Sequence, residues 1–184
     1  VSPMCMYSSE DGYANDWHLV HLGSRAVGGA GLVFTEATAV EARGRISPQD
    51  LGIYDDGHVE MLSRIAKFVK GRGAVVGMQL AHAGRKASTA APWAGDGGVS
   101  EAQGGWRPVV APSAVEFAEN YVVPEELDEA DAAARQVIRG VRSGTFWPPG
   151  EPPRYPDGLQ GICADRSLDR EGLISRSMNG GSLA

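Results

Sequence analysis

Short apolar runs alternate with helix-like periods from Val1 to about Gly140, and this alternation limits the folds open to the chain more than any other feature. It is typical of successive βα units that build one parallel sheet. Strands are expected at the very start of the chain, over Gly31–Glu36 and over Ala74–Leu80. The sequence therefore predicts an α/β fold with a parallel sheet.

Three helices are expected between and after these strands. The first covers Asp16–Val27, with Asn15 or Asp16 as its N-cap. The second covers Gly57–Arg72, where apolar residues recur along one side. The third covers Glu125–Gly140, because its acidic first turn suits the positive end of a helix dipole and apolar residues follow.

Two stretches depart from this regular pattern. Residues 82–124 are rich in Gly, Pro, Trp and Ser and are too long for an ordinary connection, so they are expected to form an excursion or lid that includes a hairpin. Residues 141–184 hold closely spaced prolines and many arginines but no lysine and no sustained period, which indicates an irregular tail. Residues 1–140 are expected to form the folded domain. Because Val1 already lies in a strand-like run, residues preceding this strand are expected to be missing.

Composition narrows the range of partners. The chain has 184 residues and a formal net charge of −6, with 42% hydrophobic and 22% charged residues, as an ordinary acidic globular protein has. This balance predicts no basic surface for nucleic acid or anionic lipid, and no apolar run is long enough for a membrane span. Cys5 and Cys163 are far apart, and His18, His21 and His82 do not form a metal-ligand pattern. A cytoplasmic protein without a disulfide framework or a metal is expected.

Polar or reactive side chains follow each expected strand: Cys5 and Tyr7 the first, Glu36–Thr38 the second, and Gln79 with His82 the third. In a (β/α)8 barrel the C-terminal strand ends line a single mouth, so these side chains would converge. Gln79 offers both a donor and an acceptor, as the edge of a flavin pyrimidine ring requires. Plainer interpretations stay open. Gln79 could bond backbone groups, Cys5 could be a small buried hydrophobe, and Tyr7 could pack with its hydroxyl in water.

Six ordered motifs carry a more specific signal. They are SPMCMYSS at residues 2–9, HLVH at 18–21, EATAV at 36–40, GRIS at 44–47, DLGI at 50–53 and QLAHAGRK at 79–86. Together they resemble the old yellow enzymes, a family of FMN-dependent ene-reductases, and in particular the bacterial branch with a cysteine in the first motif. The resemblance covers residues 1 to about 140.

The resemblance implies the N-terminal portion of a (β/α)8 TIM barrel, about three to four βα units, with FMN across the C-terminal mouth. It also implies hydride transfer from NADPH or NADH, through the flavin, to an activated alkene such as an α,β-unsaturated carbonyl compound. By position, the residues that would contact FMN are Ser2, Pro3, Met4, Cys5, Ala37 and Gln79. Cys5 would tune the flavin, and Tyr7 would bond the substrate carbonyl. Full-length members often associate, so a homo-oligomer is also expected.

The end of the chain departs from the family pattern. No histidine follows His82, whereas the family's next strand should end in two histidines, or a histidine and an asparagine, that hold the substrate oxygen. The strands that carry the FMN phosphate site are also lacking. Gly180–Leu183 nevertheless resembles a family segment beyond that histidine pair. One hypothesis is that residues 141–179 are read in a shifted frame, and the other is a true divergence of the tail.

Three functions therefore stay open at the level of sequence. The first is the flavin oxidoreductase just described. The second is a truncated, catalytically inactive partial barrel that cannot hold FMN stably and exposes apolar surface and sheet edges. The third is a different barrel enzyme, because this fold supports many chemistries; the combination of Cys5, Tyr7 and Gln79 argues against it.

Overall fold

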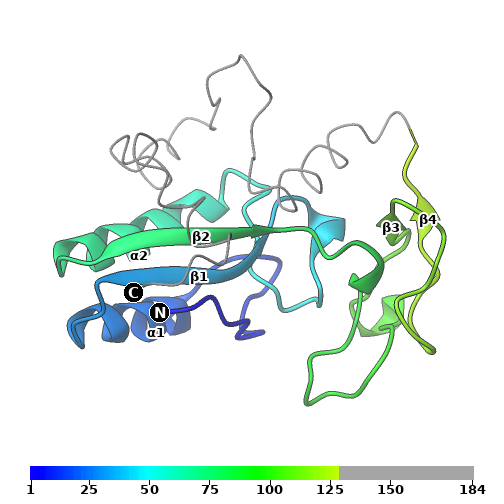
Figure 1. Ribbon diagram of the computed structural model, residues 1–184, viewed down its shortest axis with the longest axis horizontal. Coiled ribbons are helices and arrows are strands. Elements are labelled where there is room, and N and C mark those ends of the chain that lie inside the picture. Colours follow the sequence, from blue (N-terminus) through cyan, green and yellow to red (C-terminus); the bar gives the residue numbers. More distant parts are fainter. Residues whose placement is uncertain (129–184) are drawn as a thin grey trace, which may run out of the picture.

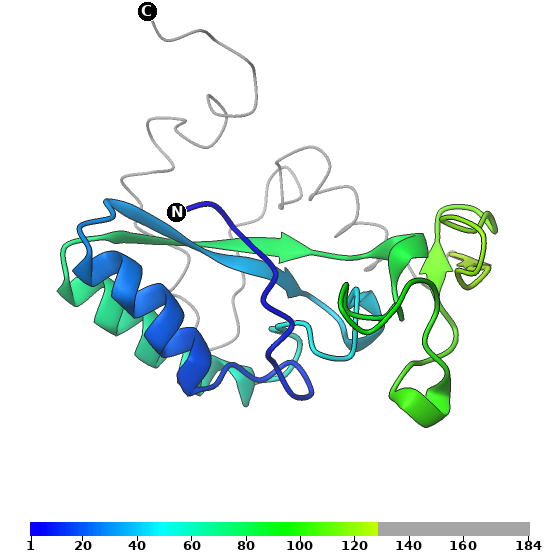
Figure 2. The ribbon, with the colours of Figure 1, turned by 90° about the horizontal axis from the view of Figure 1, so that it is seen from below.

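The computed structural model describes residues 1–128 of the chain. Its centre is a parallel pair of strands, with two helices against one face of the pair (Figures 1 and 2). In chain order the elements are α1 (Asp16–Val27), β1 (Leu32–Ala39), the 3-10 turn η1 (Ala42–Gly44), α2 (His58–Gly71), β2 (Val75–Ala81), the 3-10 turns η2 (Gly84–Lys86) and η3 (Glu101–Gln103), β3 (Val110–Ala111) and β4 (Glu125–Glu126).

Helix α1 has the bounds that the sequence predicts, and its start is capped as expected. The Asn15 side-chain oxygen accepts a hydrogen bond from the Trp17 N–H at 3.0 Å, while the Asn15 N–H donates to Nδ1 of His18 at 3.1 Å. This reciprocal pair satisfies N–H groups that would otherwise lack partners at the helix start. Helix α2 begins and ends one residue inside its predicted range.

The core lies between the helices and the two long strands. Leu22 of α1, Leu62 and Val69 of α2, and Val33 of β1 are all at most 5% exposed and belong to one cluster. Leu62 and Val69 recur at helical spacing, and Val76 and Met78 of β2, which pack against the same cluster, lie at alternate strand positions, so the apolar pattern of the sequence accounts for the layering. None of the helices within residues 1–128 is long and apolar enough to cross a membrane.

The pairing of β1 with β2 contains a bulge at Glu36. Leu32 to Thr35 pair in step with Val75 to Met78, but the next pair joins Ala37 to Gln79. The extra residue places two successive side chains, Thr35 and Glu36, in buried positions. After the bulge, Ala37 faces the side of the sheet away from the helices, next to Gln79.

The expected first strand is not formed, and this prediction is wrong. The segment runs beside β1 for a short distance: the Val1 amino group donates to the Leu32 carbonyl at 2.6 Å, and the Phe34 N–H donates to the Val1 carbonyl at 3.2 Å. The next inter-segment bond goes from the Met6 N–H to the Glu36 side chain at 2.7 Å. Because a side chain replaces the backbone acceptor, the ladder cannot continue.

Residues 82–124 form an excursion beside the C-terminal ends of the long strands (Figure 1). Within it, Thr89 and Gly98 form an antiparallel bridge, flanked by backbone hydrogen bonds from Val99 to Ser88 at 2.8 Å and from Ala90 to Gly97 at 3.1 Å. The rest of the excursion is held mainly by turns.

The predicted helix over residues 125–140 does not begin at Glu125. Glu125–Glu126 is strand β4, which pairs in parallel with β3. The N–H groups of Glu125 and Leu127 donate to the carbonyls of Val109 and Ala111 at 2.8 and 2.9 Å, and Leu127 is 1% exposed. This burial outweighs the helical composition of the segment. The rest of that helix, the irregular tail at 141–184 and the frame-shift hypothesis concern residues outside the described part.

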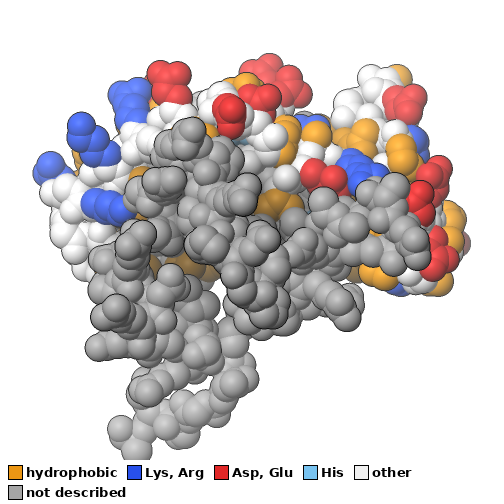
Figure 3. Space-filling view, turned by 90° about the horizontal axis from the view of Figure 1, so that it is seen from above, with side chains coloured by type: hydrophobic (Ala, Val, Ile, Leu, Met, Phe, Trp, Pro, Cys, Tyr) orange, Lys and Arg blue, Asp and Glu red, His pale blue; other side chains and the backbone are white. Residues whose placement is uncertain are grey.

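Charge is distributed unevenly over the described surface. Figure 3 shows Lys and Arg side chains at the end where α1 and α2 finish, and many Asp and Glu side chains at the end that carries the excursion. Arg25 lies in the last turn of α1 and Lys70 in the last turn of α2. Positive charge at these positions favours both helices, because the carboxyl end of a helix carries partial negative charge.

Leu62→Ala tests the core between α2 and the sheet. Removal of this side chain, which is 2% exposed, is expected to lower the free energy of unfolding by about 2–5 kcal/mol through lost burial and the cavity left behind. Urea denaturation followed by circular dichroism measures the change. Lys67→Ala, on the exposed side of the same helix, is the matched control and should change stability by less than about 0.5 kcal/mol. Equal losses in both variants would contradict this core assignment.

Candidate functional site at the C-terminal strand ends

Three segments that are distant in sequence meet at the C-terminal ends of β1 and β2. The Cys5 thiol lies within the electrostatic reach of the Ala37 backbone, and Ala37 is the register partner of Gln79. Ala37 is half-buried and Gln79 is exposed. The structure therefore brings together Cys5, Ala37 and Gln79, three of the residues singled out in the sequence, on the side of the sheet away from the helices.

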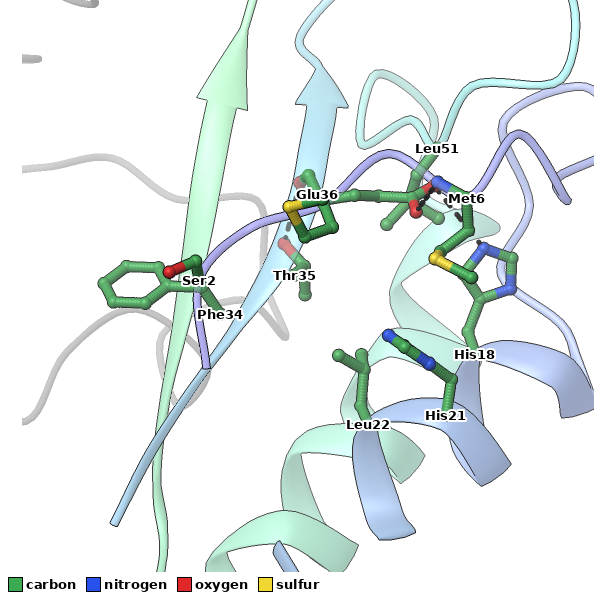
Figure 4. A pocket seen from close by; sticks show the side chains of 10 residues that line it. Ser2, Met6, His18, His21, Leu22, Phe34, Thr35, Glu36 and Leu51 are labelled. Carbon is green, nitrogen blue, oxygen red and sulfur yellow. Dashed lines mark hydrogen bonds and ion pairs between the residues drawn. The ribbon is translucent and has the colours of Figure 1, made fainter. Parts of the chain in front are cut away.

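Ser2, Pro3 and Met4 lead into this site along the edge of β1. Pro3 is half-buried, whereas Ser2 and Met4 are exposed, Met4 to 66%. Ser2 and Met4 also line a small cavity between the N-terminal segment, α1 and β1 (Figure 4). Its volume is about 10 Å³, which is about the space of one water molecule. A ligand as large as a flavin would have to bind on the open face of the sheet.

Tyr7 is held in an uncommon backbone conformation. Its φ angle is +48°, in the left-handed region that residues with a side chain rarely adopt. The ring is half-buried and meets the ring of Trp93 edge-on. Burial raises the pKa of the Tyr7 hydroxyl above its usual range, and the nearby Cys5, Asp50 and Glu36 raise it further. The hydroxyl is consequently a hydrogen-bond donor at neutral pH.

A buried carboxylate joins the N-terminal segment to β1. Glu36 is 5% exposed, and its Oε2 accepts a hydrogen bond from the Met6 N–H at 2.7 Å. Its Oε1 lies 3.7 Å from Nε2 of His18, which is itself 3% exposed (Figure 4). Because Met6 lies between Cys5 and Tyr7, this contact fixes the stretch of chain that carries both candidate residues. Sequence reasoning missed this role, although Glu36 begins one of the recognised motifs.

Ser9, His18 and Glu36 do not form a hydrolytic triad. Ser9 Oγ lies 3.2 Å from Nε2 of His18, the same ring nitrogen that faces Glu36, while Nδ1 of His18 is engaged with Asn15. A triad needs the hydroxyl and the carboxylate on opposite nitrogens of the ring. Ser9 is also only 5% exposed, so its hydroxyl has no access to a substrate. The cluster is structural.

Asp50 is a second buried carboxylate beside the site, and the sequence reasoning did not single it out. It is 3% exposed, and burial raises its pKa to about 6, against the opposing effect of a 2.7 Å hydrogen bond from the Ile46 N–H. Its charge also raises the pKa values of Cys5 and Tyr7. The signal available in the sequence was its position as the first residue of the recognised motif DLGI at 50–53.

The Cys5 thiol is in an environment that disfavours the thiolate. Burial raises its pKa most, and the charges of Asp50 and Glu36 raise it further, while the Ala37 backbone and Lys86 act in the opposite direction. Reactive cysteines usually have the reverse arrangement, with positive neighbours and a lowered pKa. At neutral pH, Cys5 is therefore a neutral, polarisable thiol.

His82 connects the ends of β1 and β2. Its Nε2 lies 2.5 Å from Oε1 of Glu41, and its Nδ1 accepts the Gly84 N–H at 3.0 Å. The hydrogen bond from His82 lowers the pKa of Glu41. A Cβ atom on Gly44 would lie 2.7 Å from the imidazole ring, so the close approach requires glycine. His82 therefore holds the segments that follow β1 and β2 together. Within residues 1–128, no three His, Cys, Asp or Glu side chains gather as metal ligands would.

Comparison with known proteins agrees with this geometry. The family model "NADH:flavin oxidoreductase / NADH oxidase family" matches residues 1–138. The chain belongs to this family. The sequence motifs predicted a resemblance to the old yellow enzymes, and the family match confirms this prediction.

Two curated relatives show the extent of the similarity. An NADH:flavin oxidoreductase of Gibberella zeae is 45% identical over 151 residues, which cover 76% of this chain and 37% of that protein. An NADPH dehydrogenase of Geobacillus sp. is 48% identical over 146 residues, which cover 78% of this chain and 38% of that protein. The chain thus spans less than two-fifths of the length of these relatives.

Solved structures establish the fold. Morphinone reductase superposes with a TM-score of 0.57 at 20% identity, over 79% of this chain and 41% of that one. The old yellow enzyme homologue from Zymomonas mobilis superposes with a TM-score of 0.57 at 23% identity, over 78% and 40%. The predicted fold, an incomplete N-terminal portion of a (β/α)8 barrel, is confirmed.

Substitutions at Glu36 test its contact with Met6. Glu36→Ala leaves the Met6 N–H without its acceptor and is expected to cost about 1–3 kcal/mol of stability, whereas Glu36→Gln keeps an acceptor and should cost less. Both remove a charge that raises the pKa of Cys5, so the thiol should react faster with iodoacetamide at neutral pH. The rate is measured in a Cys163→Ser background, with the exposed Glu60→Gln as control. Unchanged Cys5 reactivity in both Glu36 variants would contradict the assignment.

Asp50 is expected to make stability depend on pH. Its pKa is near 4 in the unfolded chain and about 6 in the folded chain, so the folded state retains a proton that the unfolded state loses. Stability should fall as pH rises from about 4 to about 6, by on the order of 2–3 kcal/mol. Urea denaturation of the wild type and Asp50→Asn across this window isolates the effect. A constant difference between the two proteins over the window would show that Asp50 does not titrate in this way.

Proposed function

We propose that this chain carries the flavin-contacting and substrate-facing segments of an FMN-dependent oxidoreductase that transfers hydride from NADPH or NADH to α,β-unsaturated carbonyl compounds. The observation that carries the proposal is the meeting of Cys5, Ala37 and Gln79 at the C-terminal strand ends. Family membership and the names of the curated relatives support it. Those relatives are much longer than this chain, so an activity like theirs is a proposal for this protein.

The residues at these strand ends fit a flavin. The Gln79 amide is exposed and has no hydrogen-bond partner among the described residues, so both its donor and its acceptor are available to the polar edge of the ring. Ala37 beside it is small, which lets a planar ring approach the sheet. Ser2, Pro3, Met4 and Cys5 approach from the edge of β1 and are proposed to contact the same cofactor.

FMN, when bound, supplies the hydride chemistry, and the protein side chains position the substrate and polarise its carbonyl group. The Tyr7 hydroxyl, protonated at neutral pH, would donate a hydrogen bond to the substrate carbonyl. Cys5 would place a neutral thiol beside the flavin and influence its potential through local polarity. Burial, and after it the charges of Asp50 and Glu36, raise the pKa values of both groups further above neutral pH.

The second candidate function is a partial barrel that does not hold FMN stably. It is favoured by exposed apolar residues around the open face, such as Leu32 at 43% and Val75 at 46%. Such a protein would associate through its exposed surface and bind hydrophobic dyes. A homo-oligomer, a cytoplasmic location and the choice between NADPH and NADH remain predictions.

Gln79→Leu tests the flavin contact. Loss of one to two hydrogen bonds is expected to weaken FMN binding by roughly 5- to 100-fold, as measured by quenching of flavin fluorescence during titration. Val75→Ala is the matched control, because Val75 lies on the same strand and face but at the other end, and it should leave affinity unchanged. Equal affinity of Gln79→Leu and wild type would contradict the role of Gln79.

The substrate class is tested separately. FMN-loaded protein is reduced with NADPH without oxygen and mixed with 2-cyclohexen-1-one or with saturated cyclohexanone. The proposal predicts flavin reoxidation by the unsaturated ketone alone. If the protein binds FMN but the enone does not reoxidise the reduced flavin, the cofactor assignment stands and the proposed substrate class is wrong.

A further inference from the structure

Trp93 is the most exposed large hydrophobic residue in the described chain, with 72% of its surface accessible. A tryptophan left in water forgoes the large burial free energy available to an indole ring. Core packing therefore does not explain its position. Trp93 lies in the excursion of residues 82–124, and the segments before and after it both make defined contacts.

The hairpin of residues 88–99 places Trp93 at its tip. Ser88 and Thr89 at the base are buried, and Thr89 is joined to the loop after β1 by hydrogen bonds from its N–H at 2.8 Å and its Oγ1 at 3.1 Å to the Ile46 carbonyl. At the tip, the Ala94 N–H donates to the Ala91 carbonyl at 2.8 Å and closes a turn. The hairpin is thus anchored beside the C-terminal end of β1.

A second anchor holds the far side of the excursion against the same loop. The Arg45 guanidinium lies over the rings of Trp106 and Tyr54, at 5.0 and 5.8 Å from their centres. The indole N–H of Trp106 donates to the Arg43 carbonyl at 3.1 Å. These contacts fix the base of the excursion to the loop that follows β1, so the hairpin tip has a defined place relative to the site.

At that place Trp93 meets Tyr7. Their ring centres are 5.4 Å apart and their planes are perpendicular, the edge-to-face arrangement that aromatic pairs favour. The rest of the indole remains exposed and offers a flat apolar surface beside the Tyr7 ring.

We propose that Trp93 is a positioning residue for Tyr7 and forms the outer wall of the region that receives a planar unsaturated carbonyl compound. The edge-to-face contact holds the Tyr7 ring in one orientation, so that its hydroxyl points at the carbonyl, and the exposed indole covers the bound molecule. This inference rests on the proposed function and adds a residue that determines affinity and shape selectivity.

The contact is tested without flavin. Isotope-labelled tyrosine reports each ring by NMR, and Tyr7→Phe identifies the Tyr7 resonance. Trp93→Ala should shift that resonance, because the neighbouring ring current is lost, and should lower the pKa of Tyr7 toward its ordinary value, because water reaches the ring. Trp93→Phe, which keeps an aromatic edge, should restore part of both effects. Trp17→Ala on α1 is the matched control, since Trp17 is also exposed and stacks on His21.

The role in substrate binding is tested on the FMN-loaded chain with 2-cyclohexen-1-one. Trp93→Ala is expected to raise KM roughly 2- to 10-fold, the range that one aromatic pair supports, with the rate of flavin reduction by NADPH unchanged. Trp17→Ala should change neither. An unchanged Tyr7 resonance and pKa in Trp93→Ala would overturn the proposal, as would an unchanged KM. A wild type that holds no FMN would contradict the proposed function, while the NMR result would still decide whether Trp93 positions Tyr7.

Discussion

The candidate site depends on the buried carboxylate of Glu36. A carboxylate in a protein interior is costly unless it is hydrogen-bonded or paired. Here it accepts the Met6 N–H and faces His18. The β-bulge allows Glu36 to face inward, because the extra residue gives β1 two successive buried side chains, Thr35 and Glu36. Once Glu36 faces inward, Ala37 lies on the open face beside Gln79, and the segment carrying Cys5 and Tyr7 is fixed against the same strand.

Burial dominates the electrostatics of the site. It raises the pKa values of Cys5 and Tyr7 most, and the negative charges of Asp50 and Glu36 raise them further. Both groups therefore stay protonated in neutral solution. This environment suits hydrogen-bond donation to a ligand, whereas an activated thiolate nucleophile would need positive neighbours. It agrees with a chemistry in which a bound cofactor carries the reactive electrons and the protein polarises the acceptor.

The regular elements could be predicted from sequence because local signals and burial agree there. The Asn15 cap and the apolar side of the helix define α1 correctly, and the motif at residues 79–86 identifies the family. The bulge could not be predicted, since nothing in Leu-Val-Phe-Thr-Glu-Ala reveals which residue is extra. The first strand and the start of the helix at Glu125 were wrong for a similar reason. Their partners, the Glu36 side chain and the backbone around Val110, are distant in sequence, and tertiary contacts outweighed local preference.

Hydrogen exchange with and without FMN tests the central claim most directly. If Glu36 holds the N-terminal segment against β1 and the strand ends receive a flavin, the Met6 amide, which donates to Glu36, and the β2 amides that bond to β1 should exchange slowly in the free protein. Both should slow further when FMN is added, while peptides from α2 should not change. Fast exchange of the Met6 amide that FMN does not alter would contradict the account, because the three segments would then not form one site.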